Sequence, residues 1–388
     1  MKRRFLLLVA ALLMMCSGVK ADNVLYAVVD GTTMTLKYGD ESAMPTGAKK
    51  YGVWSWSQSF CSAITTAIID ESCKNYSGTG LNHLFFNWVN LTTIKDLTNL
   101  NTANVTTMES MFSDCKSLES LDLSGFKTDK VTNMSQMFGS CTELKSVIVG
   151  DNWNTGNVTT SSAMFSHCTK LVGEDGTICN GVLYADEVAQ ATTGTGGYLT
   201  KKTVTVAANT VGSDNWATYY KSNVNRKADA NTTVYKAAVS GDKMTLTEIS
   251  DKIIKAGQAV ILKSSAASIT LTSTIDDATG DFTGNVLEGV DVATDRASDN
   301  TYYVLGKGSA GIIGFYKYEG TLSANKAFYK VAAGSREYFT IEGFSTGIQE
   351  MEAVSGKKAD VYYDLSGRRL AQPKKGVNIV NGKLVIIK

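Results

Sequence analysis

Val131-Thr-Asn-Met-Ser-Gln-Met-Phe-Gly-Ser-Cys-Thr-Glu-Leu144 is the stretch that decides how the N-terminal half of this chain folds. The same pattern, Val-x-x-Met-x-x-Met-Phe-x-x-Cys-x-x-Leu, also begins at Val105 and, with Ser161 in place of the first Met, at Val158. The copies therefore start 26 and then 27 residues apart (105 to 131, 131 to 158). A fixed period of this length marks a unit that cannot bury its apolar face alone, so the copies are expected to stack into a solenoid.

Two different spacings of apolar residues divide each copy. Leu121 and Leu123 alternate with polar residues, which predicts a short strand with these two side chains inward. Val131, Met134 and Phe138 recur every three or four residues, which predicts one face of a helix or a short 3₁₀ run. Each rung is therefore expected to be a strand, a turn and a short helical return.

Positions outside this pattern keep the same register. Five residues before each Val stands an apolar residue and three before it stands a threonine: Leu100, Phe126 and Trp153, and Thr102, Thr128 and Thr155. The first set predicts an inner ladder, and the threonine hydroxyls are expected to bond neighbouring turns. Upstream, Leu84-Phe-x-x-Trp-x-x-Leu91 reads as a divergent first copy with Trp88 in the Cys slot and Ile94 in the strand position, as a capping repeat requires.

These residues carry a resemblance to a known family. Leu118-x-x-Leu-Asp-Leu-Ser-Gly-Phe126, followed by Val-Thr-Asn-Met-Ser-Gln-Met-Phe-x-x-Cys141, resembles the BspA-type leucine-rich-repeat surface proteins of host-associated bacteria. The match spans roughly residues 60–200. The resemblance implies a cell-surface protein that adheres to host matrix proteins, whereas the spacing by itself indicates only a solenoid.

The N-terminus predicts export. Lys2-Arg-Arg4 precedes an apolar run from Phe5 to Met15, and small residues precede a cleavage point after Ala21. Cys16 leaves lipidation open as an alternative. The run is too short to span a bilayer, and no later segment is apolar enough to do so. We expect a protein that is secreted or displayed at the cell surface, in association with the outer membrane.

Beyond Tyr198 the period is lost and many short strand patterns follow. Examples are Thr203–Val206, Trp216–Tyr220, Met244–Ile249, Ala259–Leu262, Ile269–Leu271, Tyr302–Leu305, Gly314–Tyr318 and Tyr338–Ile341. Their spacing is typical of an antiparallel β-sandwich or jelly roll. The predicted fold class is α+β and mostly β. The predicted domains are a signal peptide (1–21), an N-terminal β cap (22–60), the solenoid with its C-terminal cap (61–200), the sandwich (201–345) and a C-terminal β module (346–388).

The C-terminal module has a hairpin signal of its own. Asn381-Gly382 separates two β-branched runs, 377–380 and 384–387. Asp364-Leu-Ser-Gly-Arg-Arg369 and the glycines that follow resemble the C-terminal modules of secreted Bacteroidetes proteins, including the sorting domains of type IX secretion. The resemblance implies a signal for surface anchoring or release, and an ordinary terminal hairpin remains the alternative.

Composition argues against several functions. The net charge is +1, and positive and negative residues are interspersed. The chain therefore lacks the positive electrostatic field that would attract nucleic acid. Only His83 and His167 are present, with no metal-ligand spacing and no catalytic signature beside them, so we expect no metal, no cofactor and no enzymatic activity. Six cysteines remain after Ala21; three occupy the repeat ladder, which favours buried thiols over disulfides.

The function hypothesis is adhesion to an extracellular protein, of the host matrix or of another cell, through the strand face of the solenoid. The outward positions of two adjacent strands are the candidate contacts: Glu119, Ser120, Asp122, Lys145, Ser146 and Ile148. An alternative is glycan binding by the sandwich, where Trp216, Tyr219 and Tyr220 either stack on sugars or pair across strands. An extracellular hydrolase is a third alternative, which would need convergent carboxylates in a cleft.

Overall fold

The computed structural model is mostly β and forms two compact units, which divide after Glu342. It describes residues 22–52, 58–182, 187–211, 213–308, 312–332 and 336–342, together with four strands of the second unit. The predicted signal peptide, including Cys16, lies outside the described residues. The domain boundaries predicted inside the first unit stay predictions.

The described part of the first unit begins with a hairpin whose turn is at Asp30-Gly31. Strands β1 (Asn23–Asp30) and β2 (Thr33–Asp40) pair antiparallel, and Gly31 adopts a φ of 59° in the turn between them. The sheet has the order β3-β1-β2-β4-β5. Its other elements are β3 (Lys49–Lys50), β4 (Thr66–Ile69) and β5 (Thr93–Lys95), with η1 (Glu41–Ala43), α2 (Gln58–Ala63) and η2 (Glu71–Asn75) between them.

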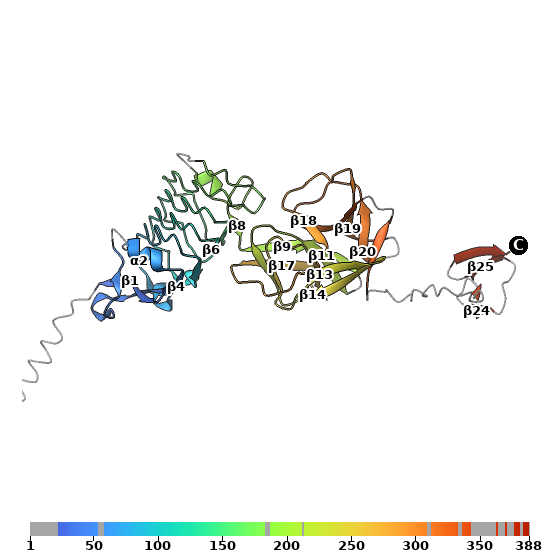
Figure 1. Cartoon of the computed structure of the whole chain (residues 1–388), viewed down its shortest axis with the longest axis horizontal. Coiled ribbons are helices and arrows are strands. Elements are labelled where there is room, and N and C mark those ends of the chain that lie inside the picture. The colour runs from blue at the N-terminus through green and yellow to red at the C-terminus, as the bar shows by residue number, and fades with distance from the viewer. Residues whose placement is uncertain are drawn as a thin grey trace, which may run out of the picture. The chain divides into compact units, whose positions relative to one another are not determined.

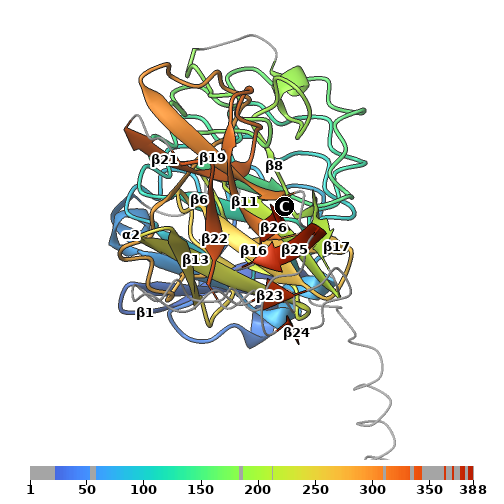
Figure 2. The ribbon, with the colours of Figure 1, turned by 90° about the vertical axis from the view of Figure 1, so that its right-hand side faces the viewer.

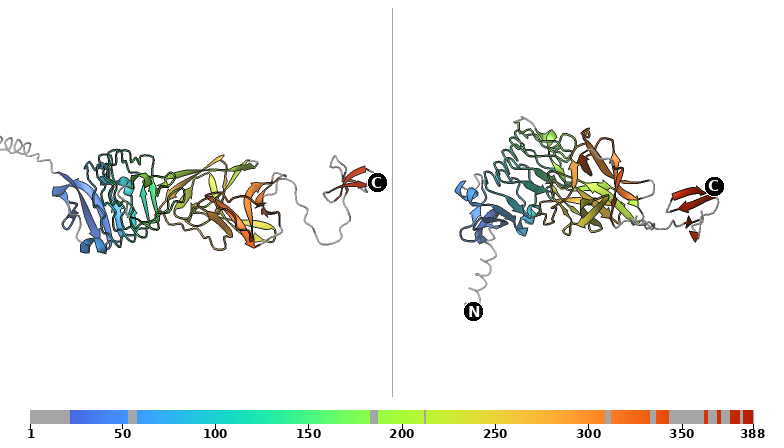
Figure 3. Two further views of the ribbon diagram at one scale, coloured as in Figure 1. Left: turned by 90° about the horizontal axis from the view of Figure 1, so that it is seen from above. Right: turned by 45° about the vertical axis from the view of Figure 1, so that its right-hand side comes forward.

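The hairpin passes directly into a stack of parallel rungs. β2 pairs with β4 and β4 with β5 in parallel, and further along the chain β6 (Ser120–Leu123), β7 (Ser146–Val149) and β8 (Thr200–Lys201) also pair in parallel. A second parallel row of single bridges joins Gly80, Thr107, Asn133 and Thr160. We call residues 66–201 the repeat stack. Its rungs lie side by side in Figure 1, and Figure 3 shows the blue N-terminal sheet at one end of them.

The predicted helical return is wrong, because each rung closes with consecutive turns. Met111, Ser113 and Cys115 donate their amides to carbonyls three residues earlier. The amides of the residues between them bond to the next rung, as Phe112 does to Met137. Left-handed residues such as Ser110 (φ 52°) turn these alternate amides outward. A helix would bond every amide within itself, so turns are the form that lets rungs bond to one another.

The apolar ladders form one core. The Met, Phe, Cys and Leu positions of the repeats are buried, as is Trp88 in the divergent first copy, and Val158 is partly buried against the same core. Rings stack rung upon rung, with centroid separations of 5.5 Å for Phe85–Phe112, 5.9 Å for Phe112–Phe138 and 5.5 Å for Phe138–Phe165. Such pairs add to the free energy gained from burial alone. The inner ladder is also present, since Leu100 and Phe126 are buried and Trp153 packs against the same core.

Two threonines of the predicted ladder bond the next turn. Thr102 accepts a hydrogen bond from the Lys127 amide at 2.7 Å, and its hydroxyl donates to the Lys127 carbonyl. Thr128 makes the same pair of bonds with Asn154. Each hydroxyl therefore acts as a clamp between successive rungs, as predicted from its place in the turn.

The last rung is closed by Glu187. Its carboxylate accepts the Phe165 amide at 2.7 Å, and its own amide donates to Ser161 Oγ at 2.9 Å. In earlier rungs that Phe amide bonds to the next copy, which is absent here. Ser161, the departure from the repeat pattern, therefore marks the end of the stack. The cap also contains η4 (Val188–Gln190), and η3 (Leu97–Asn99) lies in an earlier rung.

Residues 202–342, which we call the second β region, form two sheets over a shared core. One sheet has the order β15-β12-β17-β9 and the other β10-β11-β16-β13-β14-β22-β20-β19-β21-β18; Figure 2 shows β13, β16, β11 and β22 of the larger sheet. Val206, Ala217, Val234, Leu262 and Leu271 from both sheets meet in the core. Each strand expected here from the sequence is present.

The strands of the second β region have the following bounds. They are β9 (Thr203–Ala207), β10 (Asn209–Val211), β11 (Asp214–Tyr219), β12 (Asn225–Ala228), β13 (Thr232–Ser240), β14 (Lys243–Glu248), β15 (Ile253–Ile254), β16 (Val260–Ser264), β17 (Ser268–Thr274), β18 (Leu287–Val290), β19 (Asn300–Lys307), β20 (Ile313–Tyr318), β21 (Lys326–Ala332) and β22 (Tyr338–Ile341). Their described pairings are antiparallel, apart from the parallel pair β14 and β22.

The second unit contains one small sheet of order β24-β23-β25-β26. The bounds are β23 (Tyr362–Tyr363), β24 (Arg369–Leu370), β25 (Gly376–Val380) and β26 (Lys383–Ile387). β25 and β26 pair antiparallel with Val380 opposite Lys383, so they flank the Asn381-Gly382 position as expected of a two-residue hairpin.

Candidate functional site

Four of the six predicted contact residues lie on two adjacent parallel strands, and Glu119 and Lys145 directly precede them. β6 and β7 place Ser120 opposite Ser146 and Asp122 opposite Ile148. Just before these strands, the Lys145 ammonium donates to the Glu119 carboxylate at 2.7 Å, and both side chains are substantially exposed. Ser120, Asp122, Ser146 and Ile148 therefore share one face of the sheet formed by β6, β7 and β8.

Part of this face is closed to a partner. Ser146 and Ile148 are fully buried, which contradicts the expectation that they point to solvent. The second β region approaches the backbone beside them, where the Asn223 side-chain amide donates to the Val172 carbonyl at 2.6 Å. Lys202 also pairs with Asp122 at 2.6 Å. Of the six predicted contacts, Glu119 and Lys145 keep the most exposed side chains, and partner binding by any of the six stays a prediction.

A buried ion pair fixes this junction. The Arg226 guanidinium, fully buried, donates to both carboxylate oxygens of Glu174 at 2.9 and 2.7 Å. Lys221, also buried, donates to the Glu174 carbonyl at 2.9 Å and lies 3.5 Å from Asp291. Bidentate pairing of this kind gives directional as well as electrostatic complementarity. The second β region is therefore attached to the repeat stack by specific polar contacts.

The repeat stack keeps a different surface open. Thr79, Thr106, Thr132 and Thr159 occupy the same position in successive rungs, and all four side chains are exposed. The hydroxyls of Thr106, Thr132 and Thr159 donate to the carbonyl of the preceding threonine in the row, at 3.1, 3.2 and 3.2 Å. We call these four residues the threonine row. Sequence reasoning missed it, although the recurrence of Thr directly after each repeat Val was a readable signal.

A polar cavity of about 330 Å³ lies where the last rung meets β8 and β9. Trp153 lines it, and its indole N–H donates to the Ala191 carbonyl at 3.1 Å, which fixes the ring. Polar side chains complete the lining, among them Asp151, Asn154, Thr155, Thr192 and Lys201. The sandwich aromatics considered from the sequence do not form a comparable surface, since Trp216 and Tyr219 are buried.

The cysteines and histidines form no reactive cluster in the part of the chain that the structure describes. No group of three or more His, Cys, Asp or Glu side chains lies there within reach of one metal ion. All six cysteines are free and buried, and Cys115, Cys141 and Cys168 donate to carbonyls of the preceding rung. Burial raises the pKa of each of these three thiols, so the thiolate form is disfavoured.

Comparison with known proteins gives one partial match. A family model described as "Mycoplasma protein of unknown function, DUF285" matches residues 72–177, the central part of the repeat stack. No curated protein and no solved structure matches the chain. Within the described residues, no helix is both long and apolar enough to cross a membrane.

Proposed function

We propose that the repeat stack is a short leucine-rich-repeat solenoid of the BspA type and that the exported protein uses it to bind an extracellular protein. The partner belongs to the host matrix or to a neighbouring cell. Rung-to-rung hydrogen bonds at the repeat period support the solenoid, and the match to the repeat-containing family model overlaps the same residues. Stacked repeats offer the extended surfaces on which such proteins bind partners.

The threonine row is the observation that carries this proposal. Three of its hydroxyls are hydrogen-bonded to the neighbouring rung. Few additional side-chain rotamers of the row therefore become fixed when a partner binds. Successive side chains repeat at the spacing of parallel strands, about 4.8 Å. The result is a flat, rigid and exposed surface away from the buried positions Ser146 and Ile148.

Substitution of Thr132 by Arg tests the row at its centre. The mature chain would be immobilised and probed with purified host matrix proteins and bacterial surface extracts by interferometry. We expect a specific partner whose affinity falls by at least about tenfold in Thr132→Arg, because the long side chain breaks the flat contact.

The matched control is Thr247→Arg, an equally exposed threonine on β14. Equal loss in both variants would argue against the row. If partner binding were lost only in the double variant Glu119→Ala/Lys145→Ala, the partner would contact the exposed part of the strand face and not the threonine row. If all of these variants still bound the partner, the proposal that the solenoid recognises it would be wrong.

Export and anchoring form a separate part of the proposal. We propose cleavage after Ala21, and a sorting role for residues 346–388 like that of type IX secretion modules in Bacteroidetes. The basic and apolar N-terminal run supports the first step, and the sheet of β23–β26 is consistent with the second. N-terminal sequencing of the exported protein should begin at Asp22; a lipidated Cys16 at the start would show the alternative processing.

Glycan binding is the second candidate function, and the cavity beside Trp153 favours it. A fixed indole among carboxylate, amide and hydroxyl groups is the combination that sugar rings use for stacking and hydrogen bonding. We expect any glycan-array signal of the mature chain to be lost in Trp153→Ala and kept in Thr132→Arg. Signals that survive Trp153→Ala would exclude this cavity.

A further inference from the structure

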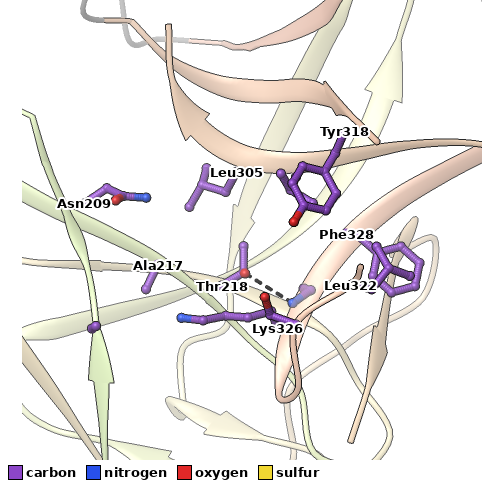
Figure 4. Close-up of a pocket in the computed structure, with 12 residues that line it drawn as sticks. Asn209, Ala217, Thr218, Leu305, Tyr318, Leu322, Lys326 and Phe328 are labelled. Carbon is purple, nitrogen blue, oxygen red and sulfur yellow. Dashed lines mark hydrogen bonds between the residues drawn. The ribbon is translucent and has the colours of Figure 1, made fainter. Parts of the chain in front are cut away.

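A second cavity lies inside the second β region, remote from the repeat stack. It has a volume of about 220 Å³ and is bounded by β11 on one side and by β19–β21 on the other (Figure 4). Ala207, Ala217, Val304, Leu305, Leu322 and Phe328 supply an apolar lining. It is larger than the engineered cavity of about 150 Å³ that binds benzene in a protein interior. The space therefore fits one ring or a short hydrocarbon chain with a polar group.

Among the described residues that line the cavity, Lys326 of β21 is the only one with a cationic side chain. Figure 4 shows this side chain extending from β21 past Thr218 in the direction of Ala217. Burial alone lowers the pKa of Lys326, and no neighbouring charge contributes to the shift. Lys330 on the same strand, by contrast, pairs with the Glu288 carboxylate at 2.9 Å. A partly buried ammonium without an anion is costly to maintain, which makes an anionic ligand the natural complement.

The wall that bears Lys326 is held in place. The Ala327 amide donates to the Thr218 hydroxyl at 3.1 Å, which joins β21 directly to β11 across the edge of the cavity. Ala327 and Thr218 are both buried, and Lys326 pairs with Val290 in the neighbouring strand β18. The amino group is therefore presented from a fixed strand, as a preorganised ligand site requires.

We propose that this cavity binds a small organic carboxylate, with the carboxylate on Lys326 and the apolar tail between β11 and β19–β21. The charge of Lys326 selects the carboxylate, and the volume limits the tail to about one aromatic ring or five to seven carbons. Tyr318 and Asn209 lie at the rim of the same cavity and add hydrogen-bonding capacity there. This site is independent of protein adhesion by the repeat stack.

Calorimetric titration of the mature chain with hexanoate and phenylacetate tests the site. Hexanol and 2-phenylethanol, which match the tails and lack the charge, are the neutral comparison ligands. We expect the carboxylates to bind at least about tenfold more tightly than the alcohols, which is the minimum effect of one charge-assisted hydrogen bond.

Lys326→Met isolates the charge while keeping an apolar chain of similar length. This variant should lose the preference for carboxylates and still bind the alcohols, which would show that the cavity itself remains. Lys330→Met, on the same strand but paired with Glu288 at 2.9 Å, is the matched control and should bind as the unaltered chain does. Unaltered carboxylate affinity in Lys326→Met, equal affinity for alcohols and carboxylates, or no binding of either by the unaltered chain would overturn the proposal.

Discussion

Glu187 ends the repeat stack. Its carboxylate takes the place of the backbone carbonyl that a further rung would supply. A further rung would accept the Phe165 amide with a backbone carbonyl, whereas here a carboxylate does so at 2.7 Å. The side chain is almost completely buried, and burial raises the pKa of Glu187. Because the pKa is raised by burial, ionisation of this carboxyl is less favourable in the folded chain than in the unfolded chain.

Replacing Glu187 separates its hydrogen bond from its charge. Glu187→Ala leaves the Phe165 amide without an acceptor and should lower the free energy of unfolding by about 1–3 kcal/mol. Glu187→Gln keeps an acceptor oxygen and removes the buried charge, so at pH 7 it should be at least as stable as the unaltered chain. Denaturation in guanidinium measures both; a Gln variant as unstable as the Ala variant would contradict the assignment.

At the scale of the element, the rungs combine side-chain stacking with backbone bonding. The aligned phenylalanines from Phe85 to Phe165 fill the same position in each rung, and alternate amides join neighbouring rungs. Each rung therefore buries its neighbour and bonds to it. Loss of a central ring should affect the rungs on both sides.

Phe138→Ala tests this coupling at the middle of the ring stack. The ring is fully buried between Phe112 and Phe165, so its removal should cost about 3–5 kcal/mol of unfolding free energy. Phe86→Ala is the control, because that ring is 38 % exposed and its loss should cost clearly less than the loss of Phe138. Similar costs for both substitutions, measured by urea denaturation, would refute the central role of the ring stack.

The start of η2 predicts a pH dependence. Asp70 accepts from the Lys37 ammonium at 2.7 Å and from the Ser72 amide at 3.0 Å, and these bonds hold the pKa of Asp70 at about 2, below the ordinary 3.8. Because the folded pKa is depressed, this contribution to stability is complete above pH about 4 and is lost as the pH falls toward 2. Asp70→Asn should show a shallower fall in melting temperature over that window; parallel curves would disprove the link.

The sequence predicted those features of the repeat stack that depend on residues close together in the chain. The positions from Val105 to Leu171 have a strict period, so register, burial and the clamping role of Thr102 and Thr128 followed from spacing alone. The helical return was wrong because an apolar spacing of three or four also fits consecutive turns. Burial of Ser146 and Ile148 depends on Asn223 and its neighbours far along the chain, which no local pattern contains.

At the scale of the whole first unit, the junction between the repeat stack and the second β region depends on buried charge. Arg226 and Glu174 come from the two sides of this junction, and the guanidinium also donates to the Lys201 carbonyl at 3.0 Å. Burying these groups carries a desolvation cost that their pairing offsets. The geometry therefore specifies one docking arrangement.

A double-mutant cycle checks the junction. Arg226→Met leaves the Glu174 carboxylate with the Lys201 amide but without its cationic partner and should cost about 3–5 kcal/mol, whereas addition of Glu174→Gln should recover part of that loss. Lys227→Met, at the exposed neighbouring position, is the control. Strict additivity of the two junction substitutions in thermal or chemical denaturation would mean that the pair is not coupled.

The rung-to-rung bonds of the repeat stack also determine how it would respond to mechanical force. A load applied to the two ends of the stack would be carried by the bonds between neighbouring rungs, so rungs should be released one after another. Every rung of 26 or 27 residues released in this way adds about 90 Å of extended chain. Single-molecule pulling should therefore lengthen the tether in steps of that size, so that the chain would gain slack under load before all of its rungs were lost.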